Sequence, residues 1–507
     1  MKKLLLGVCL LLSATLALAQ MPEETWQEVK QAALQGNSAH VEQLLRPWAE
    51  RGDARAQYNL GVMYGDGRGV APDYAKTREW WEKAAAQGHA GAQYNLGVMY
   101  YDGRGVAQDY TKALKWWEKA AAQGDADAQY SLGTMYDAGQ GVAQDYAKAR
   151  KWFEKAAAQG LAAAQYNLGF MHHDGQGIAQ DYAKARKWFE KAAAQGFAQA
   201  QYNLGLMYYH GQGVAKDYAK AREWWEKAAA QGDAIAQFNL GVMYHDGHGV
   251  VQDYAKAREW LEKAAAQGLA AAQYNLGVMY RDGQSVAHDY AKAREWWEKA
   301  AAQGHAGAQY NLGFMYYDGH GVAQNYAKAR EWWEKMTAQG NASAQYNLGV
   351  MYRDGQGVVQ NYVKAREWFE QAAAQGHAEA QYNLGVMYYH GQGVAKDYVK
   401  AREWWEKTAA QGNASAQYNL GVMYRDGQGV AQDSAKAREW LEKAAAQGDA
   451  KAQYNLGLMY YHGQGVAKDL FKAREWYEQV AAQRENAENA EVVRKARQIL
   501  EQIRQVR

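Results

Sequence analysis

Few side chains in this chain have the types and spacing that catalysis requires. Ser285 stands in the segment GQSVA, which is close to the GxSxG motif of nucleophilic serines but lacks its final glycine. Carboxylates recur at one position in nearly every copy of a repeated pattern, as Glu118 and Glu226 do. Catalysis needs unlike groups at one place, so this repetition favours helix caps and solvated faces and predicts a protein that is not an enzyme.

Thirteen histidines raise the question of a metal site. The clusters nearest to a ligand set are His172–His173–Asp174 and His245–Asp246–His248. Equivalent residues of successive repeats cannot share an ion, because packed helix axes lie about 8–10 Å apart and zinc–nitrogen bonds measure about 2.0–2.1 Å. The recurring DGxG segments have too few oxygen-bearing side chains for calcium, which takes about 6–8 ligands. We therefore predict no metal site and no cofactor.

Export is indicated by the first 19 residues. Lys2 and Lys3 precede the apolar stretch 4–18, and Ala17 and Ala19 form a small-residue cleavage site, so residues 1–19 read as a signal peptide. The mature protein would be periplasmic or secreted and would lack Cys9, the only cysteine, so disulfides and thiol chemistry are excluded.

The charge and hydropathy of the mature chain exclude two kinds of partner. Removing Lys2 and Lys3 from the 57 basic residues balances them against the 55 acidic ones, so no nucleic-acid partner is expected. No later segment reaches the roughly 20 apolar residues that span a bilayer, so no stable membrane insertion is expected after signal removal.

One period of 36 residues runs through twelve copies without insertion or deletion. A period of this length is typical of solenoids, in which each repeat packs only on its neighbours. The aromatic residue of the AQYNLG motif marks the register. It falls at Tyr58, Tyr94, Tyr130, Tyr166, Tyr202, Phe238, Tyr274, Tyr310, Tyr346, Tyr382, Tyr418 and Tyr454.

Each copy contains two helical patterns, which residues 89–124 illustrate. Ala92, Leu96 and Met99 form an apolar stripe on the first helix, where Gly97 would allow a neighbouring helix to approach closely. The DGRG segment ends this helix, because its glycines tolerate a positive φ.

Asp109 is placed to cap the second helix. That helix would bury Tyr110, Ala113 and Trp117 and would end at Gly124.

The motifs AQYNLGxMY, DGxGV, DYxKA, WWEKAA and AQG resemble the signature of Sel1-like repeats, relatives of the tetratricopeptide repeat, over residues 53–483. The resemblance implies an all-α, right-handed superhelical α/α solenoid that acts as an adaptor or scaffold for other proteins. Residues 20–52 would form an N-terminal helical cap with a degenerate half repeat. Residues 484–507 would form a C-terminal capping helix, since terminal repeats need a polar outer surface.

Twelve tryptophans at the first position of the WW pair, among them Trp80, Trp116 and Trp152, could form a ladder that stacks on sugars. We favour a core role instead, because they lie beside the apolar stripe of the second helix.

Two positions vary while the rest of the repeat stays nearly constant. The one after MY accepts Gly, Asp, His, Tyr and Arg, and the one before AQ is equally diverse. Packed interiors tolerate such changes badly, so both positions should be exposed. The position after MY would either line a concave recognition face, together with the Tyr94 and Val98 positions, or be a solvated helix end. The candidate binding residues are Tyr94, Tyr101, Tyr209, Arg281, Tyr317, Arg353, Tyr389, Arg425 and Tyr461.

These observations predict a non-catalytic scaffold exported to the cell envelope, which binds a protein or peptide partner on its concave face. The principal alternative is a surface or secreted factor that engages a glycan or a host-cell receptor. An envelope hydrolase is the third possibility.

Overall fold

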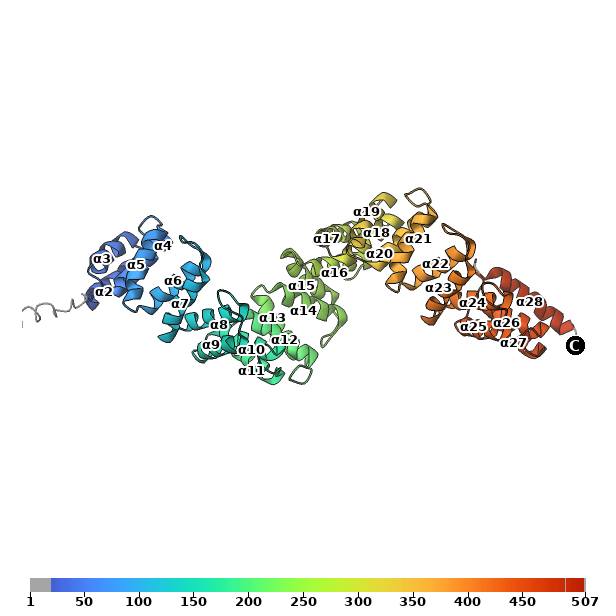
Figure 1. Ribbon diagram of the computed structural model, residues 1–507, viewed down its shortest axis with the longest axis horizontal. Helices are drawn as coiled ribbons and strands as arrows, with labels where there is room; N and C mark the ends of the chain where they lie inside the picture. The colour runs from blue at the N-terminus through green and yellow to red at the C-terminus, as the bar shows by residue number, and fades with distance from the viewer. Residues whose placement is uncertain (1–19, 488, 506–507) are drawn as a thin grey trace, which may run out of the picture. The chain divides into compact units, whose positions relative to one another are not determined.

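Every regular element that the computed structural model describes, in residues 20–487 and 489–505, is an α-helix (Figure 1). The expected signal peptide lies outside the described residues. The chain divides into two compact units, residues 1–264 and 265–507, and the same helix pair is repeated within each.

Two helices precede the repeats and one follows them. They are α2 (Glu23–Leu34), α3 (Ser38–Glu50) and α28 (Ala490–Gln505). The first helices of the twelve pairs are α4 (Ala54–Asp66), α6 (Ala90–Asp102), α8 (Ala126–Ala138), α10 (Ala162–Asp174), α12 (Ala198–His210), α14 (Ala234–Asp246), α16 (Ala270–Asp282), α18 (Ala306–Asp318), α20 (Ala342–Asp354), α22 (Ala378–His390), α24 (Ala414–Asp426) and α26 (Ala450–His462). The second helices are α5 (Tyr74–Ala86), α7 (Tyr110–Ala122), α9 (Tyr146–Ala158), α11 (Tyr182–Ala194), α13 (Tyr218–Ala230), α15 (Tyr254–Ala266), α17 (Tyr290–Ala302), α19 (Tyr326–Thr337), α21 (Tyr362–Ala374), α23 (Tyr398–Ala410), α25 (Ser434–Ala446) and α27 (Leu470–Ala482).

Caps predicted from the sequence fix both ends of these helices. The Asp109 carboxylate accepts a hydrogen bond from the backbone N–H of Lys112 at 2.9 Å and so begins α7. Gly103 ends α6 with a φ of 73°, and Gly124 follows α7 with a φ of 93°, both in the left-handed region that glycine adopts without steric cost.

Close approach of the two helices in each pair depends on the glycine inside the first helix. A Cβ atom at Gly97 would lie 2.3 Å from the Trp117 ring, and the equivalent nearest distances in the other repeats range from 2.2 to 2.7 Å. Trp117 is 4% exposed, and the equivalent side chains are Trp, Phe, Leu or Tyr. The expectation that Gly97 admits a neighbouring helix is therefore confirmed.

A buried glutamine, which the sequence analysis missed, connects successive helix pairs. Gln93 is 5% exposed. Its Nε2 donates to the carbonyl oxygen of Ala85 at 3.1 Å, and its Oε1 accepts from Gln123 at 2.7 Å. The same pair of bonds recurs at other repeats, for example at Gln381 with Gln411. Burial of this amide is tolerated because both of its ends are hydrogen-bonded.

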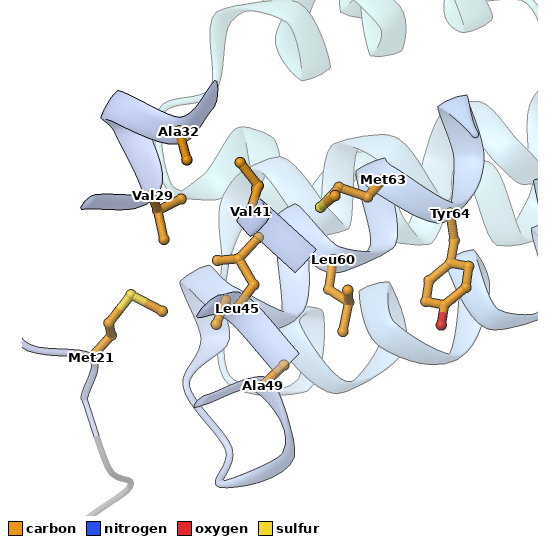
Figure 2. Close-up of a cluster of buried hydrophobic side chains, with 10 residues drawn as sticks. Met21, Val29, Ala32, Val41, Leu45, Ala49, Leu60, Met63 and Tyr64 are labelled. Atoms are coloured by element: carbon orange, nitrogen blue, oxygen red, sulfur yellow. The ribbon is translucent and has the colours of Figure 1, made fainter. Parts of the chain in front are cut away.

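The helices that flank the repeats extend the apolar core. Met21, Val29 and Leu45 pack with Leu60 and Met63 of the first repeat in the cluster that Figure 2 shows. At the other end, Val493, Ala496 and Leu500 of α28 pack against Tyr477 and Val480 of α27. Each end of the array is thus covered by an amphipathic helix.

Candidate interaction surface

The residues after MY lie in the last turn of each first helix, and all twelve are half-buried. The expectation that this position is exposed therefore holds only in part. Six of its tyrosine and arginine side chains are bonded to, or lie within bonding distance of, groups in the following repeat, which the pattern of a single copy does not show.

Tyrosines at this position cross to the next repeat. The Tyr101 hydroxyl donates to Oε1 of Gln140 at 2.6 Å, and the Tyr389 hydroxyl donates to Gln428 at 2.7 Å. In each case the acceptor lies in the DGxG-type loop that follows the next first helix. The Tyr101 ring also packs 5.4 Å from the Trp117 ring, centroid to centroid, so the tyrosine is held on two sides.

The other two central tyrosines make the same crossing. The Tyr209 hydroxyl lies 2.9 Å from Nδ1 of His248, and the Tyr317 hydroxyl is hydrogen-bonded to Gln356. Tyr461, in the last repeat, instead packs with the core that α28 covers.

Arginines at this position are neutralised by the acidic residue that follows them. Nε and Nη2 of Arg353 donate to the two carboxylate oxygens of Asp354 at 2.7 and 2.8 Å, and Nη1 donates to Oδ1 of Asn383 at 2.7 Å. Arg425 makes the same three bonds with Asp426 and Asn455.

These arginines stay charged, and each is paired with the carboxylate of the aspartate that follows it. Arg281 pairs with Asp282 at 2.6 and 2.9 Å. Hydrogen bonding to the neighbouring aspartate raises the pKa of Arg281, Arg353 and Arg425. These side chains offer planar faces and local dipoles rather than an unbalanced positive charge.

The Tyr94 position is half-buried between the two helices of its pair. The Tyr94 ring lies 6.5 Å from the Trp117 ring, and the Tyr94 carbonyl oxygen accepts the indole N–H of Trp117 at 3.1 Å. Burial is the main cause that raises the pKa of Tyr94. The tyrosine at this position therefore packs between helices and is still partly exposed.

The second variable position, before AQ, is the more open one. Its larger polar side chains, such as Gln199, Glu379 and Lys451, are exposed, and Ile235 is 48% exposed. None of the twelve residues at this position is buried.

Cavities between neighbouring repeats lie beside three of the residues after MY that are not tyrosine. One of about 330 Å³ lies beside Gly65, one of about 230 Å³ beside Arg281 and one of about 460 Å³ beside Arg425. All three are lined by the first helix of the next repeat, through Asn95, Asn311 and Asn455. At these three places a notch is open beside the residue after MY, whereas Tyr101 and Tyr389 reach across to the loop of the next repeat.

The twelve tryptophans at the first position of the WW pair are half-buried and contribute to packing. Trp116 packs against the cluster that contains Ala84 of the preceding repeat and Leu96 of its own repeat. The Lys119 ammonium group lies 4.2 Å from the centroid of its ring. Ten of the twelve tryptophans carry a lysine in this way, which leaves little open ring face for a sugar.

The residues considered for metal or nucleophilic chemistry lie on helix ends and in loops. In the part of the chain that the structure describes, no group of three or more His, Cys, Asp or Glu side chains is placed to hold a metal ion. His173 and His245 each pair with the aspartate that follows, at 2.5 and 2.6 Å. Ser285 is exposed in the loop between α16 and α17, where sister repeats carry glycine.

No helix among the described residues combines the length and the apolar character needed to cross a membrane.

Helix pairs stacked through a common apolar seam define an α/α repeat solenoid, as predicted from the period. A model of the family described as Sel1 repeat matches twelve consecutive segments. They are residues 54–89, 90–125, 126–161, 162–197, 198–233, 234–269, 270–305, 306–341, 342–377, 378–413, 414–449 and 450–484. The chain belongs to the Sel1 repeat family, whose solenoid is typically a non-catalytic scaffold consistent with protein–protein interaction.

Two solved structures show the same fold. One is c5321, a protective antigen present in uropathogenic Escherichia coli strains that displays an SLR fold. It is 37% identical, with a TM-score of 0.71, over 90% of this chain and 97% of that chain. The other is a Sel1 repeat protein from Oxalobacter formigenes, 36% identical with a TM-score of 0.51, over 61% of this chain and 90% of that chain. A search of curated proteins finds no match.

Proposed function

We propose that this protein is an exported, non-catalytic scaffold that binds a protein or peptide along the face formed by its first helices. The observation that carries the proposal is the variable position after MY. It stands at the same place in every repeat, and beside Gly65, Arg281 and Arg425 it borders a notch toward the next repeat. A row of equivalent notches with different linings suits the side chains of an extended chain.

The chemistry of this row favours a protein ligand. Tyr and Arg are enriched where proteins bind one another, because they combine broad contact area with planar hydrogen-bonding groups. Each arginine here is paired with an aspartate, so recognition rests on shape and directed hydrogen bonds more than on net charge. We therefore expect a weaker dependence of affinity on salt than free arginines would give.

A second candidate function is engagement of a host receptor or a glycan at the cell surface. It is favoured by the likeness to c5321, described as a protective antigen of uropathogenic Escherichia coli. The lysines over the tryptophan rings argue against a sugar-stacking ladder.

The test is a binding screen of the chain from residue 20 against envelope proteins, with peptidoglycan fragments in parallel. A saturable protein partner supports the scaffold, whereas binding of glycan alone would replace it with the second candidate. The partner is then titrated against Arg281→Tyr, Arg353→Tyr and Arg425→Tyr combined. This variant narrows the notches beside Arg281 and Arg425 and gives all three positions the residue that sister repeats already accommodate, so affinity should fall about tenfold or more while the fold is kept.

The matched control changes the outer face of the second helices. Lys115, Lys151 and Lys187 are exposed there and occupy equivalent positions. Their combined change to Gln should leave partner affinity within about twofold. If this control abolishes binding and the arginine variant does not, the partner uses the other face.

A further inference from the structure

The notch between repeats 11 and 12, residues 414–449 and 450–484, differs from its counterparts. It has a volume of about 460 Å³, twice that of the notch of about 230 Å³ beside Arg281. Its lining combines Arg425 and Ser434 from one repeat with Asn455 and Met459 from the next.

The extra space arises where this chain departs from its own repeat. The first residue of the second helix is tyrosine in ten copies, but it is Ser434 in α25. The second aromatic position of the same helix is Leu441, where the repeat around Arg281 has Trp297. Two rings that line the smaller notch, Tyr290 and Trp297, are thus replaced by smaller side chains.

The repeat 72 residues earlier shows what fits in this space. It has the same arginine, aspartate and asparagine, as Arg353, Asp354 and Asn383. Its second helix begins with Tyr362, whose ring packs on the core cluster that contains Met387.

Polar groups that hold Tyr362 have counterparts around Ser434. Gln360 donates to the Arg353 carbonyl oxygen at 2.8 Å and to the Tyr362 hydroxyl at 3.0 Å. Gln432 makes the first of these bonds, at 2.8 Å to Arg425. An arriving phenol would complete the second. The Arg425 guanidinium lines the same notch and offers a planar face to an aromatic ring there.

From this internal comparison we infer that the notch beside Ser434 receives a tyrosine side chain of a protein partner. The inference rests on the proposed scaffold function and gives it a defined contact. Met459 and Leu458 form the apolar floor, Gln432 takes the hydroxyl, and the exposed Asp426 and Gln432 mark the solvent side. A tyrosine ring suits the space because it is broad, rigid and polar at one end.

The test uses the chain from residue 20 with ¹³C-labelled methionine methyl groups and 4-methylphenol, the side chain of tyrosine, as the probe. The Met459 methyl signal should shift and saturate, whereas the Met387 signal should not, because the Tyr362 ring stands in the place that Ser434 leaves open. Ser434→Tyr should abolish the Met459 response, and Tyr362→Ser should create one at Met387. Each helix starts with a residue found at that position in a sister repeat, so both variants should fold.

Two further probes separate the occupants. The peptide acetyl-Gly-Tyr-Gly-amide should shift Met459 at about tenfold lower concentration than acetyl-Gly-Ala-Gly-amide. A response to N-acetylglucosamine but not to 4-methylphenol would overturn the inference in favour of a sugar. No Met459 response to the phenol or to the tyrosine peptide, or an unchanged response in Ser434→Tyr, would also overturn it. These results do not depend on the partner screen, so the scaffold could stand while the tyrosine contact fails.

Discussion

Side chains read correctly from the sequence are those whose role is local. Asp109 caps a helix three residues away, and Gly97 is explained by the helix that contains it together with its pair. Tyr101 was misjudged because its partner, Gln140, lies 39 residues further on. Gln93 was missed for the same reason, since the bond from Gln123 spans 30 residues.

Strain at one residue gives a test of the loop geometry. Ser285 is the only non-glycine residue with a positive φ, 62°, among the described residues. Side chains other than glycine lose about 1–2 kcal/mol in the left-handed region. Ser285→Gly should therefore raise the free energy of unfolding by about 1 kcal/mol, measured by urea denaturation.

The control for Ser285 is a serine with ordinary helical geometry. Ser343 is the second residue of α20, so its backbone is already helical, and glycine there brings only the entropic cost of a more flexible unfolded chain. Ser343→Gly should therefore not raise the free energy of unfolding. Equal effects of the two changes would show that the backbone at Ser285 is not strained.

The two tryptophans of a WW pair should differ in what their loss costs. Trp405 is 3% exposed and donates its indole N–H to the Tyr382 carbonyl oxygen at 3.2 Å, so Trp405→Ala should cost about 3–5 kcal/mol. Trp404 is half-buried beneath Lys407, so Trp404→Ala should cost about 1–2 kcal/mol. Thermal and urea unfolding of the two variants measure the difference. A Trp404→Ala protein with an unchanged melting profile that loses a ligand would make that column a binding platform.

At the scale of the element, three helices begin with a histidine cap, which makes them sensitive to pH. Nδ1 of His89, His305 and His377 accepts the backbone N–H three residues on, at 3.2, 3.2 and 3.4 Å. Only the neutral ring can accept at this atom. Burial is the main cause that lowers the pKa of all three, against smaller raising effects such as that of Asp53 on His89 and of Glu379 on His377.

Acidification should therefore weaken these caps. Because the folded-state pKa lies below the ordinary value of about 6.5, the unfolded chain binds more protons as the pH falls below that value, and stability is lost. Combined change of His89, His305 and His377 to Asn, the cap that Asn341 and Asn413 provide in sister repeats, should reduce the loss between pH 7.5 and pH 5. The measurement is the urea midpoint at both pH values. An equal pH dependence in the variant would place the sensitivity elsewhere.

The arginines after MY belong to the same scale, because they join one helix pair to the next. From sequence alone, Arg281, Arg353 and Arg425 were expected to be exposed. Arg353 and Arg425 in fact each donate to an asparagine of the next repeat. Their change to Ser should cost about 1 kcal/mol each, whereas Arg281→Ser, which breaks only the pair with Asp282, should cost less. Urea unfolding of the three single variants checks this order.

At the scale of the whole molecule, the period alone predicted helix pairs stacked in one dimension. That prediction succeeded because each repeat has the same two amphipathic helices and the same caps, so every local preference agrees with the fold. The period could not predict the notches, since the space between two neighbouring repeats depends on which of their side chains carry a ring. Ser434 shows the point, because its effect appears only beside Met459 of the following repeat.

If stability is a sum over repeats and their interfaces, removing one full period should leave a foldable protein. Deleting residues 126–161 takes out α8 and α9 and joins α7 to α10, so a second helix is again followed by a first helix. Deleting residues 126–143 removes only α8, so α7 would meet α9 and two second helices would adjoin. The large side chain of each second helix packs against a glycine of the first helix, such as Gly133. That glycine would be missing in this deletion.

We therefore expect the 36-residue deletion to keep the helical content per residue and to melt within a few degrees of the parent chain. The 18-residue deletion should lose helical signal and melt at a lower temperature or less cooperatively, and circular dichroism on both chains decides the matter. The deletions lie within one compact unit, so both chains retain the caps at each end of the array. Equal helicity and equal melting in the two proteins would mean that the helices fold without regard to their neighbours, against the nearest-neighbour packing of Gly97 on Trp117 and of Gln93 on Gln123.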